Sequence, residues 1–241
     1  MSKKAKRILA IGAHPDDLDF SCAGTTAKLT REGDEFFYLI VSDGSKGGID
    51  IKLNAKKLVE VRKKEQAEAA KFLKVKNVTF LGLKDGEVEN TKSLRREIVR
   101  EIRKIKPDTV FCFDPSIVVF DNPYRFHRDH RQSGEAAFDA IYPASSSPFF
   151  FPELLKQGHK PHQIKEIWFF SSSKPNKFIN ITSTIDSKLK ALSFHRSQIA
   201  DMKAVEKRVR DWAKKSGKKS GYKYAEAFRI IKFRQDNEAR K

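Results

Sequence analysis

The sequence contains only two cysteines, Cys22 and Cys112. Neither has a second cysteine or a histidine at the spacing of a zinc site, so a disulfide framework and a thiolate zinc centre are not expected. No apolar run approaches the ~20 residues of a membrane-spanning helix. The basic N-terminus is followed by an apolar run that is too short for a signal peptide and ends in charged residues. We therefore expect a soluble, cytoplasmic protein without a membrane span.

Acidic residues are scarce relative to basic ones, with 31 Asp and Glu against 49 Lys and Arg, which leaves a formal net charge of +18. Such a surplus favours acidic polymers or surfaces as partners. About half of it lies between Lys203 and Lys241, where 14 basic residues occur with 5 acidic ones. These residues are not interleaved with a stacking platform, and no nucleic-acid-binding motif is present. We interpret them as a solvated surface and do not expect a nucleic-acid partner.

The glycine fingerprint of dinucleotide-binding proteins, G-x-G-x-x-G, is also absent. At the end of the first apolar run, the corresponding positions hold Gly12, His14 and Asp17. An imidazole and a carboxylate at these places would block and repel a pyrophosphate. A nicotinamide or flavin cofactor is therefore not expected.

Short apolar runs alternate with helical patterns along the chain. Strands are predicted over 7–13, 36–42, 77–81, 109–113, 164–171, 178–181 and 230–233, and helices over 22–31, 54–73, 93–106, 133–141 and 183–195. This alternation predicts a Rossmann-like α/β protein, with a mostly parallel sheet and helices on both faces. Right-handed crossovers favour the strand order 3-2-1-4-5. We expect one domain over 1–241, with a core of about 1–172 and a smaller C-terminal extension of about 173–241.

Two polar clusters follow the first and the fourth predicted strands. They are His14-Pro-Asp-Asp17 and His127-Arg-Asp-His130. In the predicted order these strands are neighbours, and the chain reverses direction between them, which is where ligands bind in open α/β sheets. Taken alone, the first cluster can be an Asp-capped helix start and the second a polar surface loop. Their shared placement at one crevice makes both explanations poor.

A divalent metal ion suits the two clusters together. Two histidines and one carboxylate are a usual ligand set for catalytic zinc, with a fourth position left for water. A neighbouring carboxylate can remain unbound and act as general base, and another can orient an imidazole. The candidate residues are His14, Asp16, Asp17, His127, Asp129 and His130.

The predicted helix over 54–73 carries polar residues on its apolar face. Arg62 and Glu65 fall on the same stripe as Leu58, Ala69 and Phe72. Two interpretations stay open: the polar residues pair with each other at the i,i+3 spacing, or Arg62 points into a site.

These motifs resemble those of the PIG-L/LmbE superfamily of zinc-dependent N-acetylglucosaminyl deacetylases, and the resemblance covers most of the chain. The matching motifs are Ala13-His-Pro-Asp-Asp17, Ala23-Gly-Thr25, the loop 42–48, Arg62-x-x-Glu65, Leu83-x-Asp85-Gly86, Phe126-His-Arg-Asp-His-Arg131, His195-x-Ser197-Gln198 and Ala225-Glu-Ala-Phe228. The first motif and His-x-Asp-His are specific as a pair, whereas the others are individually weak but follow the family's order. One departure is Asp19, which stands where the family often has Glu.

The resemblance implies a metal centre with a separate base. His14, Asp17 and His130 are the expected ligands of Zn2+ or of another divalent transition metal. Asp16 is the expected general base that activates the metal-bound water.

The resemblance also implies roles for residues around the metal. His127 is expected to polarise the amide carbonyl or to protonate the leaving amine, with Asp129 oriented behind it. Arg62 and Asp85 match positions that contact the substrate in relatives.

The implied activity is hydrolytic removal of the acetyl group from an N-acetylglucosamine-type sugar or conjugate. A small N-acetylated sugar conjugate is thus the expected partner, and oligomeric relatives leave a homo-oligomer open. Two alternatives also stay open: a hydrolase of a different amide on the same scaffold, and a basic polyanion-binding protein with a vestigial site. The intact set of His14, Asp17 and His130 argues against the second alternative.

Overall fold

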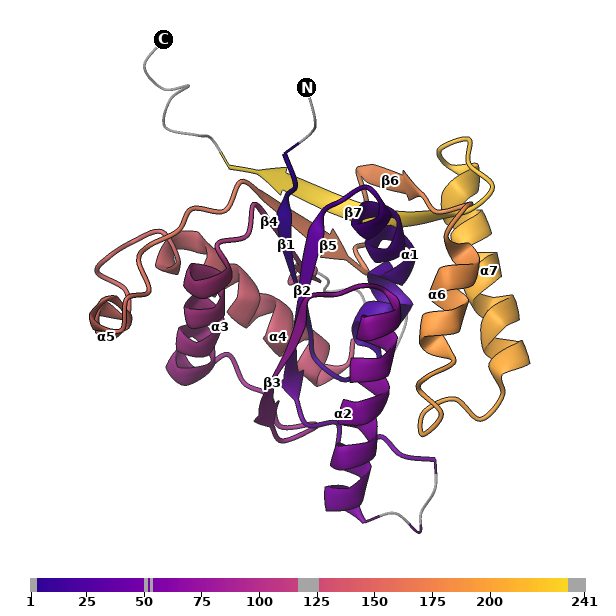
Figure 1. Cartoon of the computed structure of the whole chain (residues 1–241), viewed down its shortest axis with the longest axis horizontal. Coiled ribbons are helices and arrows are strands. Elements are labelled where there is room, and N and C mark those ends of the chain that lie inside the picture. Colours follow the sequence, from indigo (N-terminus) through magenta and orange to yellow (C-terminus); the bar gives the residue numbers. More distant parts are fainter. Residues whose placement is uncertain (1–3, 50–51, 53, 117–125, 234–241) are drawn as a thin grey trace.

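The computed structural model describes residues 4–49, 52, 54–116 and 126–233 (Figure 1). The strands are β1 (Arg7–Gly12), β2 (Glu35–Ser42), β3 (Asn77–Leu83), β4 (Thr109–Phe113), β5 (Glu166–Phe170), β6 (Lys177–Asn180) and β7 (Ala225–Lys232). The helices are α1 (Asp17–Arg31), α2 (Ala55–Phe72), α3 (Lys92–Ile105), α4 (Arg128–Asp139), the π-helical turn η1 (Ala140–Ala144), α5 (Pro152–Lys156), α6 (Ile185–Leu192) and α7 (Met202–Lys218). None of the described helices is long and apolar enough to cross a membrane.

A seven-stranded sheet forms the middle of the molecule, in the order β3-β2-β1-β4-β5-β7-β6. The first five strands in this order pair in parallel with one another, which confirms the predicted order 3-2-1-4-5 and the α/β class. β7 pairs antiparallel with β5, and β6 pairs antiparallel with β7, so the C-terminal region extends the same sheet. The division into a core and an extension near residue 173 stays a prediction.

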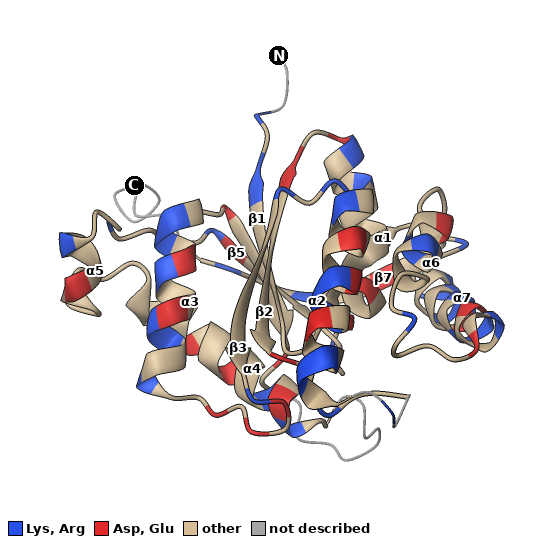
Figure 2. Cartoon of the chain, turned by 60° about the horizontal axis from the view of Figure 1, so that its bottom comes forward, with Lys and Arg blue, Asp and Glu red and all other residues tan. Residues whose placement is uncertain are grey.

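Helices cover both faces of the sheet, as Figure 2 shows with the sheet seen nearly edge-on. On one face, α3 packs Leu94, Ile98 and Ile102 against strand residues such as Leu9 and Leu39. On the other face, α1 and α2 pack against the opposite sides of the same strands. Because both faces are buried, β1 and β4 read as continuous apolar runs rather than alternating ones.

Two helices begin earlier than predicted, and both differences concern the polar clusters. α1 begins at Asp17 instead of Cys22, and α4 begins at Arg128 instead of Ser133. Each cluster therefore opens a helix, where acidic side chains are favoured by the helix dipole. The connection between β4 and α4 ends at the N-cap His127, and its residues 117–125 lie outside the described residues.

The last strand also differs from the prediction. β7 begins at Ala225, so the segment Ala225-Glu-Ala-Phe228, which precedes the predicted strand over 230–233, is part of the strand. Its backbone pairs with β6 in an antiparallel register, which a reading of local composition could not reveal. Residues 234–241 of the predicted extension lie outside the described residues.

Candidate active site

The two polar clusters meet where β1 and β4 end. These strands are adjacent and parallel, so the segments that follow them leave the sheet at the same edge. His14 Nδ1 lies 3.3 Å from His130 Nε2, although 116 positions separate the two residues in the chain. The two clusters therefore meet at the switch point of the sheet, as the predicted strand order requires.

The orientation of His130 depends on a close approach between α4 and β4. A Cβ atom on Gly134 would lie 2.9 Å from the carbonyl oxygen of Phe113, so only glycine fits one helical turn after His130. The imidazole of His130 stacks on the ring of Phe113, with ring centroids 4.1 Å apart. This packing fixes the plane of the ring and directs Nε2 toward the first cluster.

Ligand atoms of His14, Asp17 and His130 lie close together, and each of the two oxygens of Asp17 faces one imidazole. His14 Nδ1 lies 3.4 Å from Asp17 Oδ2, and His130 Nε2 lies 3.1 Å from Asp17 Oδ1. Together with the 3.3 Å between the two imidazoles, these separations match the roughly 3.3 Å between ligands of a tetrahedral ion with bonds of about 2.0–2.1 Å. The donor set therefore fits a zinc-sized divalent ion.

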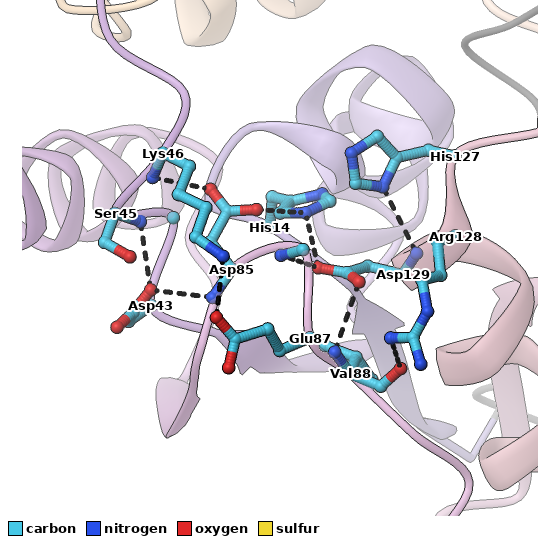
Figure 3. Close-up of polar contacts among 12 residues, drawn as sticks. His14, Asp43, Ser45, Lys46, Asp85, Glu87, Val88, His127, Arg128 and Asp129 are labelled. Atoms are coloured by element: carbon cyan, nitrogen blue, oxygen red, sulfur yellow. Dashed lines mark hydrogen bonds and ion pairs between the residues drawn. The ribbon is translucent and has the colours of Figure 1, made fainter.

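The second nitrogen of His14 faces two carboxylates (Figure 3). His14 Nε2 lies 3.2 Å from Asp129 Oδ2 and 3.2 Å from Asp85 Oδ1. Asp129 also accepts backbone N–H groups from Gly86 and Val88. A proton on Nε2 that is shared with these carboxylates leaves the Nδ1 lone pair free to bind a metal ion.

The expected position of Asp129 behind His127 is wrong. Its carboxylate is buried against His14 and the backbone of Gly86 and Val88, and only its backbone N–H contacts His127, at Nδ1. The reason is local: His127 is the N-cap of α4, whereas Asp129 lies inside the first turn and points the other way. Asp129 thus positions His14.

Two other groupings of ligand atoms are also compact enough to hold an ion: His14 with His127 and His130, and His14 with Asp85 and Asp129. However, Asp85 accepts the backbone N–H of Lys46, and Asp129 accepts two more backbone N–H groups. These carboxylates are thereby already oriented as acceptors for His14 Nε2. We interpret them as partners of a ligand rather than as ligands.

The charge of His14 reflects this acidic surrounding. Burial lowers its pKa, but hydrogen bonds with Asp129, Asp17 and Asp85 outweigh burial and raise it to about 12. Burial likewise opposes ionisation of Asp17, yet the charge of His130 and its hydrogen bonds hold the Asp17 pKa well below its usual range. A proton on His14 and a metal ion thus compete for the same negative pocket.

Asp16 lies beside the three candidate ligands and has a different environment. Burial raises its pKa to about 6, although the charge of Arg62 lowers it. Arg62 NH2 lies 3.4 Å from the Asp16 carboxylate and donates to the carbonyl of Pro15 at 2.6 Å. A carboxylate with a pKa near neutrality is suited to accept a proton at pH 7.

Arg62 itself is buried and points from α2 toward the site. This favours the interpretation that Arg62 serves a site over the interpretation that it pairs with Glu65. It donates to the Gly44 carbonyl, and a Cβ on Gly44, which has φ of +66°, would lie 2.7 Å from its guanidinium. Glu65 instead accepts from the backbone and hydroxyl of Ser197. Substrate contacts of Arg62 and Asp85 stay a prediction.

His127 is exposed at the mouth of the site. Its ring lies 4.7 Å from the His14 ring, centroid to centroid. Because its Nδ1 accepts the Asp129 backbone N–H, the neutral ring carries its proton on Nε2. Burial and the charges of His14 and His130 lower its pKa, so the ring is a neutral hydrogen-bond donor.

The chain is similar to known proteins in both sequence and fold. Residues 9–141 match the sequence model of the family described as GlcNAc-PI de-N-acetylase. The chain belongs to the PIG-L family of deacetylases. It is 35% identical to the diacetylchitobiose deacetylase of Thermococcus kodakarensis, over 94% of this chain and 83% of the relative.

Further PIG-L relatives are similar over nearly the same span. A probable N-acetyl-alpha-D-glucosaminyl L-malate deacetylase 2 of Bacillus anthracis is 27% identical, over 82% of this chain and 84% of the relative. The solved structure of the N,N'-diacetylchitobiose deacetylase from Pyrococcus horikoshii superposes with a TM-score of 0.88 at 34% identity, over 95% of this chain and 85% of that one. The fold of the chain is therefore that of a PIG-L deacetylase.

Three fully buried polar residues lie next to Asp16, and the sequence motifs alone assign them no role. They are Asp19, Gln66 and His195, and they are hydrogen-bonded to one another in a row. Gln66 had a detectable signal, because it lies one turn after Arg62 on the same inward stripe of α2. Asp19 and His195 are 176 positions apart, and no spacing rule joins them.

Proposed function

We propose that this PIG-L protein is a metal-dependent hydrolase that removes the acetyl group from an N-acetylglucosamine unit of a sugar or conjugate. The observation that carries the proposal is the convergence of His14, Asp17 and His130, with separations of 3.1–3.4 Å, beside the carboxylate of Asp16, which lies 3.4 Å from Arg62 NH2. The names of the Thermococcus and Pyrococcus relatives support short N-acetylated sugars as the substrate class.

The metal-binding residues of the proposal are His14, Asp17 and His130, which would hold Zn2+ or another divalent transition metal. The ion would supply a Lewis acid that polarises a carbonyl group and makes a nearby water more acidic. Asp85 and Asp129 hold the proton on His14 Nε2, which directs Nδ1 to the ion.

Proton transfer in the proposal rests on Asp16 and His127. Asp16 accepts a proton from the attacking water, since a pKa of about 6 leaves it ionised at pH 7 while keeping it basic. His127 donates from Nε2 to the amide oxygen as negative charge develops there, or to the departing nitrogen. The products are acetate and the free amino sugar. A cytoplasmic location and a homo-oligomer stay predictions.

The test is acetate release from N-acetylglucosamine, N,N'-diacetylchitobiose and a simple aryl acetamide by the zinc-loaded protein. We expect release from the sugars, its loss in Asp16→Ala, and normal rates in the control Asp211→Ala, an exposed residue of α7. Hydrolysis of the aryl acetamide alone would favour another amide as substrate. Full zinc loading without any hydrolysis, together with salt-sensitive binding to polyanions, would contradict the proposal and favour a binding protein.

A further inference from the structure

A row of buried side chains leads from the backbone of Asp16 away from the metal-binding residues. The Asp16 backbone N–H donates to Gln66 Oε1 at 2.9 Å, and Gln66 Nε2 donates to Asp19 Oδ2 at 2.8 Å. His195 Nε2 lies 2.7 Å from the same oxygen of Asp19. All three side-chain partners have 0% exposure, so solvent does not compete for these hydrogen bonds.

Each contact in this row fixes the direction of the next. The Asp19 carboxylate accepts hydrogen bonds, so it selects the orientation of Gln66 in which the amide NH2 faces Asp19 and the carbonyl oxygen faces Asp16. The flipped amide would place two acceptors together at Asp19 and two donors together at Asp16. His195 Nε2 lies 2.7 Å from the Asp19 carboxylate, which only accepts, so the ring carries its donor proton on Nε2.

Asp16 has a backbone conformation that needs such support. Its φ of 110° and ψ of −29° lie in the left-handed region, where a residue other than glycine is disfavoured. Such strain costs of order 1–3 kcal/mol and persists where the surroundings hold it. Arg62 holds the Pro15 carbonyl on one side, and Gln66 holds the Asp16 N–H on the other.

This support leaves the carboxylate of Asp16 available. Asp16 is the N-cap of α1, yet its side chain makes no capping hydrogen bond. A typical aspartate N-cap would turn back onto its own helix. Here the backbone is held by α2 instead, so the carboxylate can face the site.

We propose that Gln66, Asp19 and His195 are positioning residues for the base Asp16, a role that rests on the proposed deacetylation. The segment between α6 and α7, which carries His195, then takes part in setting the reaction geometry. Its neighbour Ser197 is held to α2 by Glu65, so this segment is attached to the same helix as Gln66.

The first test replaces Gln66 by Met, which keeps the length of the side chain but removes both hydrogen bonds. We expect kcat to fall about ten- to a hundredfold, with KM within about twofold and bound metal per chain unchanged. In the metal-free protein, NMR should show about tenfold faster hydrogen exchange at the Asp16 amide. The matched control is Gln157→Met, at the exposed C-terminal end of α5.

The second test separates positioning from general packing. Gln can present an N–H where His195 has Nε2, so His195→Gln should retain most of the wild-type kcat, whereas His195→Phe should lose as much as Gln66→Met. Equal losses in His195→Gln and His195→Phe would overturn the proposal, as would a normal kcat in Gln66→Met. If the wild-type protein releases no acetate, the proposed function fails, and unchanged Asp16 amide exchange in Gln66→Met would separately overturn the positioning role.

Discussion

Binding of Zn2+ to the metal-free protein should release at least one proton per chain at pH 7–9. Three carboxylates raise the pKa of His14 to about 12, so its ring is fully protonated in this range. The Asp17 pKa is held low, so this ligand has no proton to lose. An imidazole binds a metal only after it loses the proton on its donor nitrogen. The released proton therefore comes from His14.

The number of protons released per bound ion can be measured by calorimetric titration in buffers with different ionisation enthalpies. The measured heat depends on the buffer in proportion to that number. Over pH 7–9 the apparent affinity should also rise by about tenfold or more per pH unit, since each ion displaces the His14 proton. His14→Ala should abolish both binding and release, whereas Asp211→Asn on α7 should change neither. Stoichiometric binding without proton release at pH 7–9 would refute the reasoning.

The remaining predictions concern the base, the helix that carries His130, and acid stability. Asp16→Asn should abolish turnover while metal content stays near that of the wild type. Activity of this variant at the level of the wild type would rule out Asp16 as the base. Gly134→Ala should destabilise the protein by about 1–3 kcal/mol in urea unfolding, because its methyl group would lie 2.9 Å from the Phe113 carbonyl; an unchanged midpoint would show that α4 can move away. The contact with His14 outweighs burial and lowers the Asp85 pKa from 3.8 to about 2, so its stabilising contribution is present above pH 3.8 and lost as the pH falls toward 2. Metal-free Asp85→Asn should therefore lose less stability than the wild type over this interval in urea titrations at fixed pH, and equal losses would contradict the assigned contact.

The architecture could be predicted because its determinants are local or topological. Apolar runs such as that of β1 mark buried strands, and the handedness of crossovers then makes β1 and β4 neighbours. The adjacency of these strands alone was enough to predict that His14 and His130 lie close together.

The details of the site could not be predicted because they depend on side-chain directions. The spacing of His127 and Asp129 does not reveal that one caps α4 while the other reaches back to His14. The helix starts were not predicted for a similar reason, since aspartate is favoured both in turns and at helix N-termini. The row from Gln66 to His195 joins three segments through buried hydrogen bonds and has no local pattern.

The most direct test of the metal site is a crystal structure of the zinc-loaded protein with anomalous diffraction measured at the zinc edge. The account predicts one peak about 2.0–2.2 Å from His14 Nδ1, a carboxylate oxygen of Asp17 and His130 Nε2, with Asp16 unbound beside it. A peak on the opposite side of His14, bound by Nε2 with Asp85 and Asp129, would contradict it.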